Sequence, residues 1–176
     1  TSIEIIIGFL IAVVIAILVS VLAIYSKYVN DVIHPLLVVI QVVPKIALVP
    51  LFLIWMGFGI TPKIITAALV CFFPIVVAFK KGLDLVDQNM VDIMRSIGGS
   101  RKDILMKVQI PSSLPHLFSG LRVGIALAAV GAIVAEFVAA TKGLGYQISY
   151  SATLVDTPLV FAAILLTVVL GIALYA

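Results

Sequence analysis

The stretch LDLVDQNMVDIMRSIGGSRKDILMKVQIPSSLPH, residues 83–116, is a polar island in an otherwise apolar chain. Charged residues make up only 11% of the 176 residues. The island carries a large share of them, namely Asp84, Asp87, Asp92, Arg95, Arg101, Lys102, Asp103 and Lys107. Because long hydrophobic runs flank it on both sides, the island is expected to lie at the surface of a membrane.

The composition indicates an integral membrane protein. Hydrophobic residues make up 64% of the chain, and the mean hydropathy is +1.34, whereas soluble domains carry roughly a quarter charged residues. The net charge is +3. In a membrane protein an excess of Lys and Arg is explained by the orientation of the chain in the membrane, so no nucleic-acid partner is expected. The single Cys71 lies in an apolar run, which excludes a disulfide within the chain and favours a small buried side chain.

About five spanning helices are expected, because a crossing needs about 20 largely apolar residues. They cover Ile5–Tyr25, Pro35–Met56, Lys63–Phe79, Leu117–Ala140 and Pro158–Ala176. Prolines divide or kink the second of these spans, and the fourth is rich in Gly and Ala, which favours a place inside the bundle. The first span has no basic flank like that of a signal peptide, and both ends of the chain are expected to be cut. We expect an all-α fold with one transmembrane domain, residues 1–176.

The placement of Lys and Arg predicts the orientation. If the spans alternate, the 26–34 loop and the island share one side. That side then holds Lys27, Lys80, Lys81, Arg95, Arg101, Lys102 and Lys107, and the other side holds Lys63 and Lys142. By the positive-inside tendency, the island is expected to be cytoplasmic.

The island itself is expected to form two short amphipathic helices. Apolar residues recur at helical spacing over 87–97, and Gly98-Gly99 ends that helix. Ser100 is expected to cap a second helix with Asp103 as its acidic partner, and Pro111 is expected to stop it. The pattern fits a loop packed on its own bundle and equally a docking element that transmits force from a soluble partner.

A family resemblance favours the docking element. Residues 92–111, DIMRSIGGSRKDILMKVQIP, resemble the EAA loop of bacterial ABC importer permeases. The resemblance continues in residues 44–59, 121–124, 135–137 and 143–148, which look like the nitrate/sulfonate/taurine branch of that family, a branch that includes permeases for vitamin precursors. This chain departs from the family at Ile93 and Met94, which replace an alanine pair and would need a roomier socket, and it lacks the family's first span.

The resemblance implies a type I ABC importer transmembrane domain in the bacterial plasma (inner) membrane. Implied partners are ABC ATPase subunits, a second permease copy that forms a homodimer, an external substrate-binding protein and the lipid bilayer. ATP and Mg would bind on the ATPase, since this chain contains no GxxxxGK[ST] phosphate loop. No enzyme activity and no cofactor are expected here. The residues implied to couple to the ATPase are Asp92, Met94, Arg95, Gly98, Gly99, Arg101 and Pro111.

Four other residues are candidates for the pathway or a gate. Pro44 and Pro50 bracket an interrupted helix, and unwound backbone at membrane depth is tolerated when it is buried or lines a cavity. Lys45 between them either attracts an anion or reaches a lipid headgroup. Glu136, near the end of the fourth span, either bonds to backbone or to the 143–147 turn, or contacts substrate. No metal site is expected, since His34 and His116 lack carboxylate or cysteine neighbours in the sequence.

Two other functions compete with an importer permease. An ion-coupled secondary transporter would also use broken helices, but the spans show no acidic pair for a coupling ion. An intramembrane enzyme would need a motif such as HExxH or an acidic dyad, and the sequence contains neither. Nitrate, sulfonates, bicarbonate and heterocyclic vitamin precursors all remain open as substrates.

Overall fold

The computed structural model describes residues 1–25, 32, 35, 37 and 39–175. Every regular element among them is helical, as expected. The elements are α1 (Ser2–Tyr25), η1 (Lys45–Leu48), α3 (Val49–Met56), α4 (Thr61–Asp84), α5 (Gln88–Ser96), α6 (Arg101–Ile104), η2 (Leu105–Gln109), α7 (Ile110–Ala139), α8 (Leu144–Thr153) and α9 (Thr157–Tyr175). Most of the expected 26–34 loop, including Lys27 and His34, lies outside the described residues.

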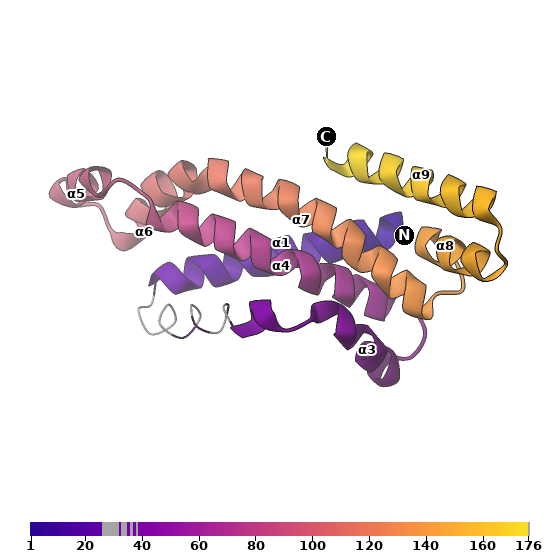
Figure 1. Ribbon diagram of the computed structural model, residues 1–176. Coiled ribbons are helices and arrows are strands. Elements are labelled where there is room, and N and C mark those ends of the chain that lie inside the picture. The colour runs from indigo at the N-terminus through magenta and orange to yellow at the C-terminus, as the bar shows by residue number, and fades with distance from the viewer. Residues whose placement is uncertain (26–31, 33–34, 36, 38, 176) are drawn as a thin grey trace.

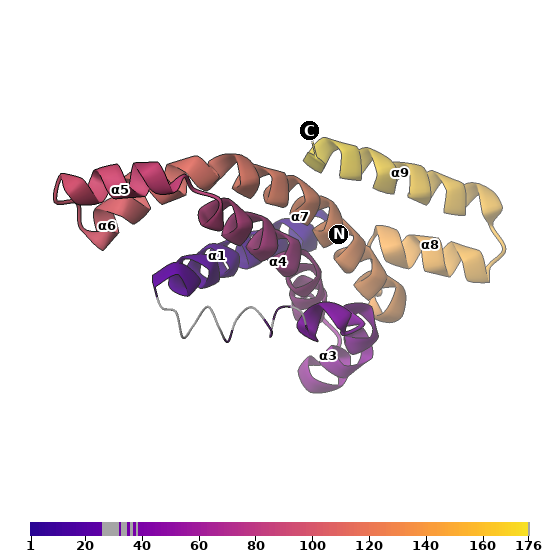
Figure 2. The same ribbon diagram turned by 60° about the vertical axis from the view of Figure 1, so that its left-hand side comes forward.

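Helices α1, α4 and α7 form the centre of the bundle (Figures 1 and 2). They converge on Ala67 of α4, where a Cβ at Gly8 of α1 would lie 2.8 Å from the carbonyl oxygen of Ile64, and a Cβ at Gly131 of α7 would lie 3.0 Å from the Cα of Ala67. Such close backbone approach is how helices associate where lipid offers no hydrophobic drive. The expectation that the small residues of the fourth span lie inside the bundle is therefore confirmed, and Cys71 is buried in the same core.

Within the described part of the chain, four helices are long and apolar enough to cross a membrane: Ser2–Tyr25, Thr61–Asp84, Arg101–Val138 and Thr157–Tyr175. The described part of the expected 35–56 span is divided, as its prolines predict. Pro44 precedes the 3-10 turn η1, and Pro50 lies in the first turn of α3, so that Lys45–Met56 is a shorter apolar helix.

The second helix of the island does not end at Pro111, which corrects the sequence prediction. α6 continues through the π-helical turn η2 into α7, and Pro111 lies in the first turn of α7. In an α-helix, a proline ring crowds the carbonyl four residues earlier and leaves it without a donor. In η2 the wider π-turn pattern, with Ile110 N–H donating to the Leu105 carbonyl, accommodates Pro111 without ending the helix.

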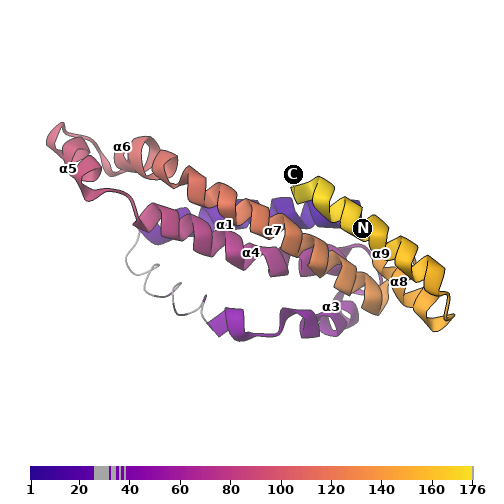
Figure 3. The same ribbon diagram turned by 45° about the horizontal axis from the view of Figure 1, so that its top comes forward.

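The two ends of α7 therefore lie at opposite ends of the bundle. α5 and α6 project beyond the ends of α1 and α4, while the chain's N-terminus and α8 lie near the other end (Figures 1 and 3). α9 runs back beside α8 and α7, and little of it is buried, with Ala163 as its buried residue. The positively charged Lys80 and Lys81 lie near the C-terminal end of α4, which is the end next to the island.

Candidate functional site

The first island helix, α5, is closed at both ends by its own sequence. Asp87 is its N-cap, and the side chain accepts a hydrogen bond from the backbone N–H of Asn89 at 2.9 Å. At the other end Gly98 adopts a φ of +80°, and the Gly98 and Gly99 amides donate to the carbonyls of Arg95 and Met94. This is the Schellman arrangement, which requires the left-handed conformation that glycine adopts without strain. The predicted glycine cap is confirmed.

The second island helix, α6, begins with the predicted capping box. The Ser100 hydroxyl accepts from the Asp103 amide at 3.2 Å, and the Asp103 carboxylate accepts from the Ser100 amide at 3.2 Å. Asp103 also forms an ion pair with Lys107 at 2.7 Å, one helical turn further on. The glycine pair and this box together set where α5 ends and where α6 begins.

The apolar residues of α5 and of its C-cap, Ile97, lie on two faces, one turned inward and one turned outward. Val91 and the half-buried Met94 point inward, where they pack in a small core. That core is shared with Val86, Ile104 and Val108. Met90, Ile93 and Ile97 point outward and are 52%, 61% and 72% exposed. Of the two residues that replace the family's alanine pair, Ile93 is therefore exposed on the outer face of the island, whereas Met94 is half-buried.

The predicted coupling charges lie at the rim of the island. Asp92 and Arg95 form an exposed ion pair at 3.2 Å. Arg95 and Arg101 line a cavity of about 480 Å³ between α5, α6 and the neighbouring ends of α1 and α4, with Asp84 on its α4 side. Pro111 is exposed on α7 and lies after the π-helical turn. The structure thus groups Asp92, Arg95 and Arg101 near the glycine hinge and separates Pro111 from them along the helix.

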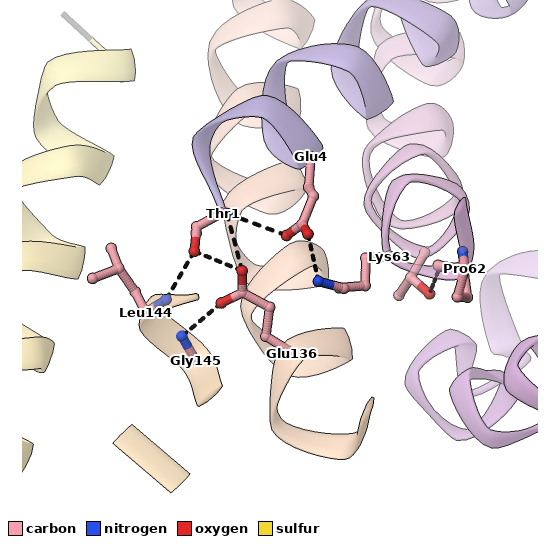
Figure 4. A network of polar contacts seen from close by, with 8 residues as sticks. Thr1, Glu4, Pro62, Lys63, Glu136, Leu144 and Gly145 are labelled. Atoms are coloured by element: carbon pink, nitrogen blue, oxygen red, sulfur yellow. Dashed lines mark hydrogen bonds and ion pairs between the residues drawn. The ribbon is translucent and has the colours of Figure 1, made fainter. Parts of the chain in front are cut away.

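The opposite end of the bundle holds a polar network around Glu136, shown in Figure 4. Glu136 is 1% exposed. Its Oε2 accepts a hydrogen bond from the Gly145 amide at 2.6 Å, and its Oε1 accepts one from the Thr1 hydroxyl at 2.6 Å. The same hydroxyl accepts from the Leu144 amide at 2.9 Å. Leu144 and Gly145 are the first residues of α8, so a side chain from α7 supplies the N-terminal cap that Gly143 lacks.

Two glycines make this cap possible. A Cβ at Gly143 would overlap the Glu136 carboxylate, and Gly143 has a φ of +129°. A Cβ at Gly145 would lie 2.5 Å from the Ile133 carbonyl oxygen. Glu136 thus bonds to the 143–147 turn, which is one of the two roles predicted for it. A contact of Glu136 with substrate stays a prediction.

The sequence did not predict the buried ion pair that lies beside Glu136. Lys63 Nζ donates to Glu4 Oε1 at 2.6 Å, and the two residues are 8% and 4% exposed. Glu4 is in the first turn of α1 and Lys63 in the first turn of α4 (Figure 4). The signal that would have revealed the pair is opposite charge in the first turns of two spans that start on the same side of the membrane.

The broken segment places Lys45 against α4. Its ammonium lies 4.9 Å from the centre of the Phe73 ring. Pro44 and Pro50 lie before and after it, at the starts of η1 and α3. Lys45 therefore lies on the side of the divided span that faces α4, and it lines a cavity there.

Among the residues that the structure describes, no three His, Cys, Asp or Glu side chains are grouped so that they could hold a metal ion. His116 lies against Gly82 near the island end of the bundle, and its Nδ1 is buried without a hydrogen-bond partner.

Comparisons with known proteins confirm the resemblance. Residues 4–176 match the family described as "Binding-protein-dependent transport system inner membrane component". The formylaminopyrimidine transport permease protein ThiX of Halalkalibacterium halodurans is 36% identical over 97% of this chain and 68% of its own length. The riboflavin transport system permease protein RibX of Chloroflexus aurantiacus is 35% identical over 86% and 56%. The taurine transport system permease protein TauC of Escherichia coli is 32% identical over 85% and 54%.

A solved structure confirms the fold. A chain of the MetNI methionine ABC transporter, in an inward-facing conformation, superposes with a TM-score of 0.81, covering 97% of this chain and 86% of that one at 18% identity. The chain spans between 54% and 68% of the length of the three relatives named above. The relatives are named as permeases of transport systems and not as enzymes. The chain therefore belongs to the family of inner membrane components of binding-protein-dependent transport systems.

Proposed function

We propose that this chain is the permease subunit of an ATP-driven ABC importer, and that it couples to a separate ATPase through residues 83–116. In this function the bundle forms the translocation pathway for a small polar nutrient. The names of the relatives, which include a taurine, a riboflavin and a formylaminopyrimidine permease, support that size and polarity of substrate. Sulfonates, nitrate, bicarbonate and vitamin precursors are the candidate classes.

The observation that carries the proposal is the outward face of α5. Met90, Ile93 and Ile97 are each more than half exposed on a helix that projects beyond the bundle (Figure 1). A soluble partner with an apolar groove would bury this face, since an amphipathic helix in a groove is a common mode of recognition. The small core of the island fixes the face in place without any partner.

The island is also joined to the bundle in a way that transmits motion. α6, η2 and α7 form one continuous helix from Arg101 to Ala139. A displacement imposed on α5 passes through the Gly98-Gly99 hinge into this helix and along the whole bundle. Asp92, Arg95 and Arg101 lie at the rim, where exposed charges set the register of docking more than its affinity. Met94 acts from inside by holding α5 against α6.

The proposal includes partners that this chain does not supply. ATP and Mg bind on the ATPase, and an external binding protein delivers the substrate. A second copy of this chain completes the pathway, with the broken segment of Pro44, Lys45 and Pro50 along it. Glu136 holds the outer end of α7 to α8 and thereby shapes the end of the bundle from which substrate would enter.

Uptake into proteoliposomes tests this proposal. The chain is reconstituted with its ATPase and binding protein, and uptake is measured with the native ATPase and with a variant that binds ATP but does not hydrolyse it. Uptake is expected to stop with the inactive ATPase. Uptake that continues, or that follows an ion gradient without any ATPase, overturns the proposal in favour of an ion-coupled secondary transporter.

A binding measurement tests the role of α5 separately. Ile93→Glu places a charge on the face that the ATPase is proposed to bury, and Val155→Glu places the same charge at an exposed site between α8 and α9. Ile93→Glu is expected to weaken co-purification of the ATPase by roughly 30-fold, about 2 kcal/mol, as for a central interface residue. Equal binding by the two variants would show that α5 is not the docking face.

A further inference from the structure

One cavity is lined by two lysines together with mostly apolar side chains. The half-buried Lys45 lies beside the middle of α4, and the exposed Lys81 lies near the island end of α4. The cavity has a volume of about 470 Å³ and lies between the segment before η1, α4 and α7. Its walls are mostly hydrophobic side chains. The polar and aromatic groups in the lining are Gln41, Lys45, Phe73, Lys81 and Ser119. Among the residues that the structure describes, no Asp or Glu lines it, so the charged groups of this lining all have one sign.

The Lys45 ammonium is held in place but is left with free donors. It lies over the Phe73 ring, 4.9 Å from the centroid, and makes one long hydrogen bond of 3.4 Å to the Gln41 carbonyl. The ring contact positions the charge without using its N–H donors. Among the ion pairs of the described residues, none involves Lys45. At least one N–H therefore remains for a ligand.

Lys81 continues the same positive surface toward the island. One face of α4 carries Phe73, Val77 and Lys81 at four-residue spacing. At a rise of 1.5 Å per residue, Lys81 lies about 12 Å further along the helix axis than Phe73. The neighbouring Lys80 pairs with Asp84 at 2.6 Å, whereas no described carboxylate pairs with Lys81. The cavity thus offers two successive cations along its length.

We propose that this cavity binds the oxyanion group of a small solute or lipid, with Lys45 as the main counter-charge and Lys81 as a second one nearer the island. A charge pair is stronger in surroundings of low dielectric than in water, and apolar walls supply such surroundings. Serine and glutamine side chains add donors for the oxygens. If the ligand is a solute, the proposal rests on the proposed function. In that case the cavity is part of the translocation pathway, and the substrate is a sulfonate, a carboxylate or a similar anion.

Charged thiol reagents measure the potential in the cavity directly. Val123 lines the cavity and is 48% exposed, so Val123→Cys in a Cys71→Ala background provides one reporter thiol. Its rate of reaction is compared for an anionic methanethiosulfonate, which carries a sulfonate, and a cationic one, which carries a trimethylammonium. The thiolate fraction affects both rates equally and cancels in their ratio. Val77→Cys, also in the lining, is the second reporter if the first variant does not fold.

The assembled transporter is measured first in phosphatidylcholine nanodiscs. The ratio of anionic to cationic rate is expected to fall roughly tenfold on Lys45→Met, and less on Lys81→Met, from the Coulomb energy of one nearby charge. Lys142→Met removes the same charge from the opposite end of the bundle and is expected to leave the ratio unchanged. A ratio that does not respond to Lys45→Met overturns the proposal, whatever the uptake experiment shows.

Two additions identify the source of the oxyanion. If a solute is the ligand, methanesulfonate slows the reaction with both reagents, and the neutral dimethyl sulfone of similar shape does not. If the headgroup of an anionic lipid is the ligand, replacing part of the phosphatidylcholine by phosphatidylglycerol lowers the rate ratio of the protein that keeps both lysines to the ratio of Lys45→Met. The same replacement changes the ratio of Lys45→Met itself much less, which separates binding at the site from the general surface potential of the bilayer. Either result supports an oxyanion site. Absence of both effects contradicts it, while ATP-dependent uptake would still stand as evidence for the importer.

Discussion

The two ends of α7 carry their charges in opposite ways. At the island end, Asp92–Arg95 and Asp103–Lys107 are ion pairs between residues of one helix or one continuous helical run, and both pairs are exposed. At the other end, Glu4–Lys63 and the contacts of Glu136 join α1, α4, α7 and α8, and all of these side chains are buried. The exposed pairs at the island end remain accessible to a partner. The buried contacts at the other end hold α1, α4, α7 and α8 together.

This difference predicts where a substitution will unfold the protein and where it will only change docking. Buried pairs are costly to break, because the remaining charge stays buried without compensation. Exposed pairs contribute little to stability. The following substitutions test the comparison, from the largest expected effect to the smallest.

Lys63→Met is expected to have the largest effect, because it leaves the Glu4 carboxylate buried without its cation. The free energy of unfolding, measured by denaturant titration in detergent micelles, should fall by about 3–5 kcal/mol. The double variant Lys63→Met/Glu4→Leu removes both charges and should recover most of the loss. A double variant as unstable as the single one would show that the pair itself is not the cause.

Gly143→Ala should destabilise the end of the bundle opposite the island through both overlap and backbone strain. The new Cβ would overlap the Glu136 carboxylate, and the residue would be forced into a left-handed conformation. We expect a loss of about 2–4 kcal/mol and faster hydrogen exchange at the Gly145 amide. Gly57→Ala is the matched control, since Gly57 has a φ of +75° but nothing within 4 Å of the added Cβ. It should lose only about 1 kcal/mol.

Gly98→Val should leave the bundle folded and separate ATP hydrolysis from uptake. Gly98 has a φ of +80° with open space around it, so the strain falls on the hinge between α5 and α6 and not on the core. The expected result is a lower number of substrate molecules taken up per ATP hydrolysed in proteoliposomes. Gly171→Val, on α9 with open space and no positive φ, should keep the native ratio. A native ratio in Gly98→Val would contradict the hinge role.

Asp92→Asn should have the smallest effect on stability, within about 0.5 kcal/mol, as for exposed ion pairs. Its effect should instead be seen in docking, as a weaker dependence of ATPase association on salt concentration. Lys107→Gln breaks the other exposed pair and serves as the comparison. If Asp92→Asn destabilised the bundle as much as Lys63→Met does, the distinction between the two ends would be wrong.

The sequence predicted the features that depend on neighbouring residues. The Asp103 capping box, the Gly98-Gly99 cap and the interruption at Pro44 all follow from local backbone chemistry, and the structure has each of them. The resemblance to the permease family supplied the type I importer fold, which composition alone left open. The small residues of the fourth span correctly predicted the central position of α7.

The features that the sequence did not predict depend on three-dimensional packing. Glu4 and Lys63 are 59 residues apart, and nothing in the sequence near either residue shows that the first turns of α1 and α4 meet. Met94 and Ile93 are adjacent in an apolar pattern, and only the core formed with Ile104 and Val108 decides which of them faces inward. Pro111 reads as a helix stop because sequence rules assume α-helical spacing, and the π-helical turn before it removes that assumption.

The π-helical turn at Leu105–Gln109 has one more consequence. This turn contains one residue more than an α-helical turn at the same position would contain. Each residue of an α-helix corresponds to a rotation of about 100° around the helix axis. Deleting a single residue from η2 would therefore leave α7 intact. It would rotate α6 and α5 by about 100° around the axis of the continuous helix that α6, η2 and α7 form. The direction in which the proposed docking face of α5 points is therefore set by the number of residues in η2, a segment that contributes none of the residues of that face.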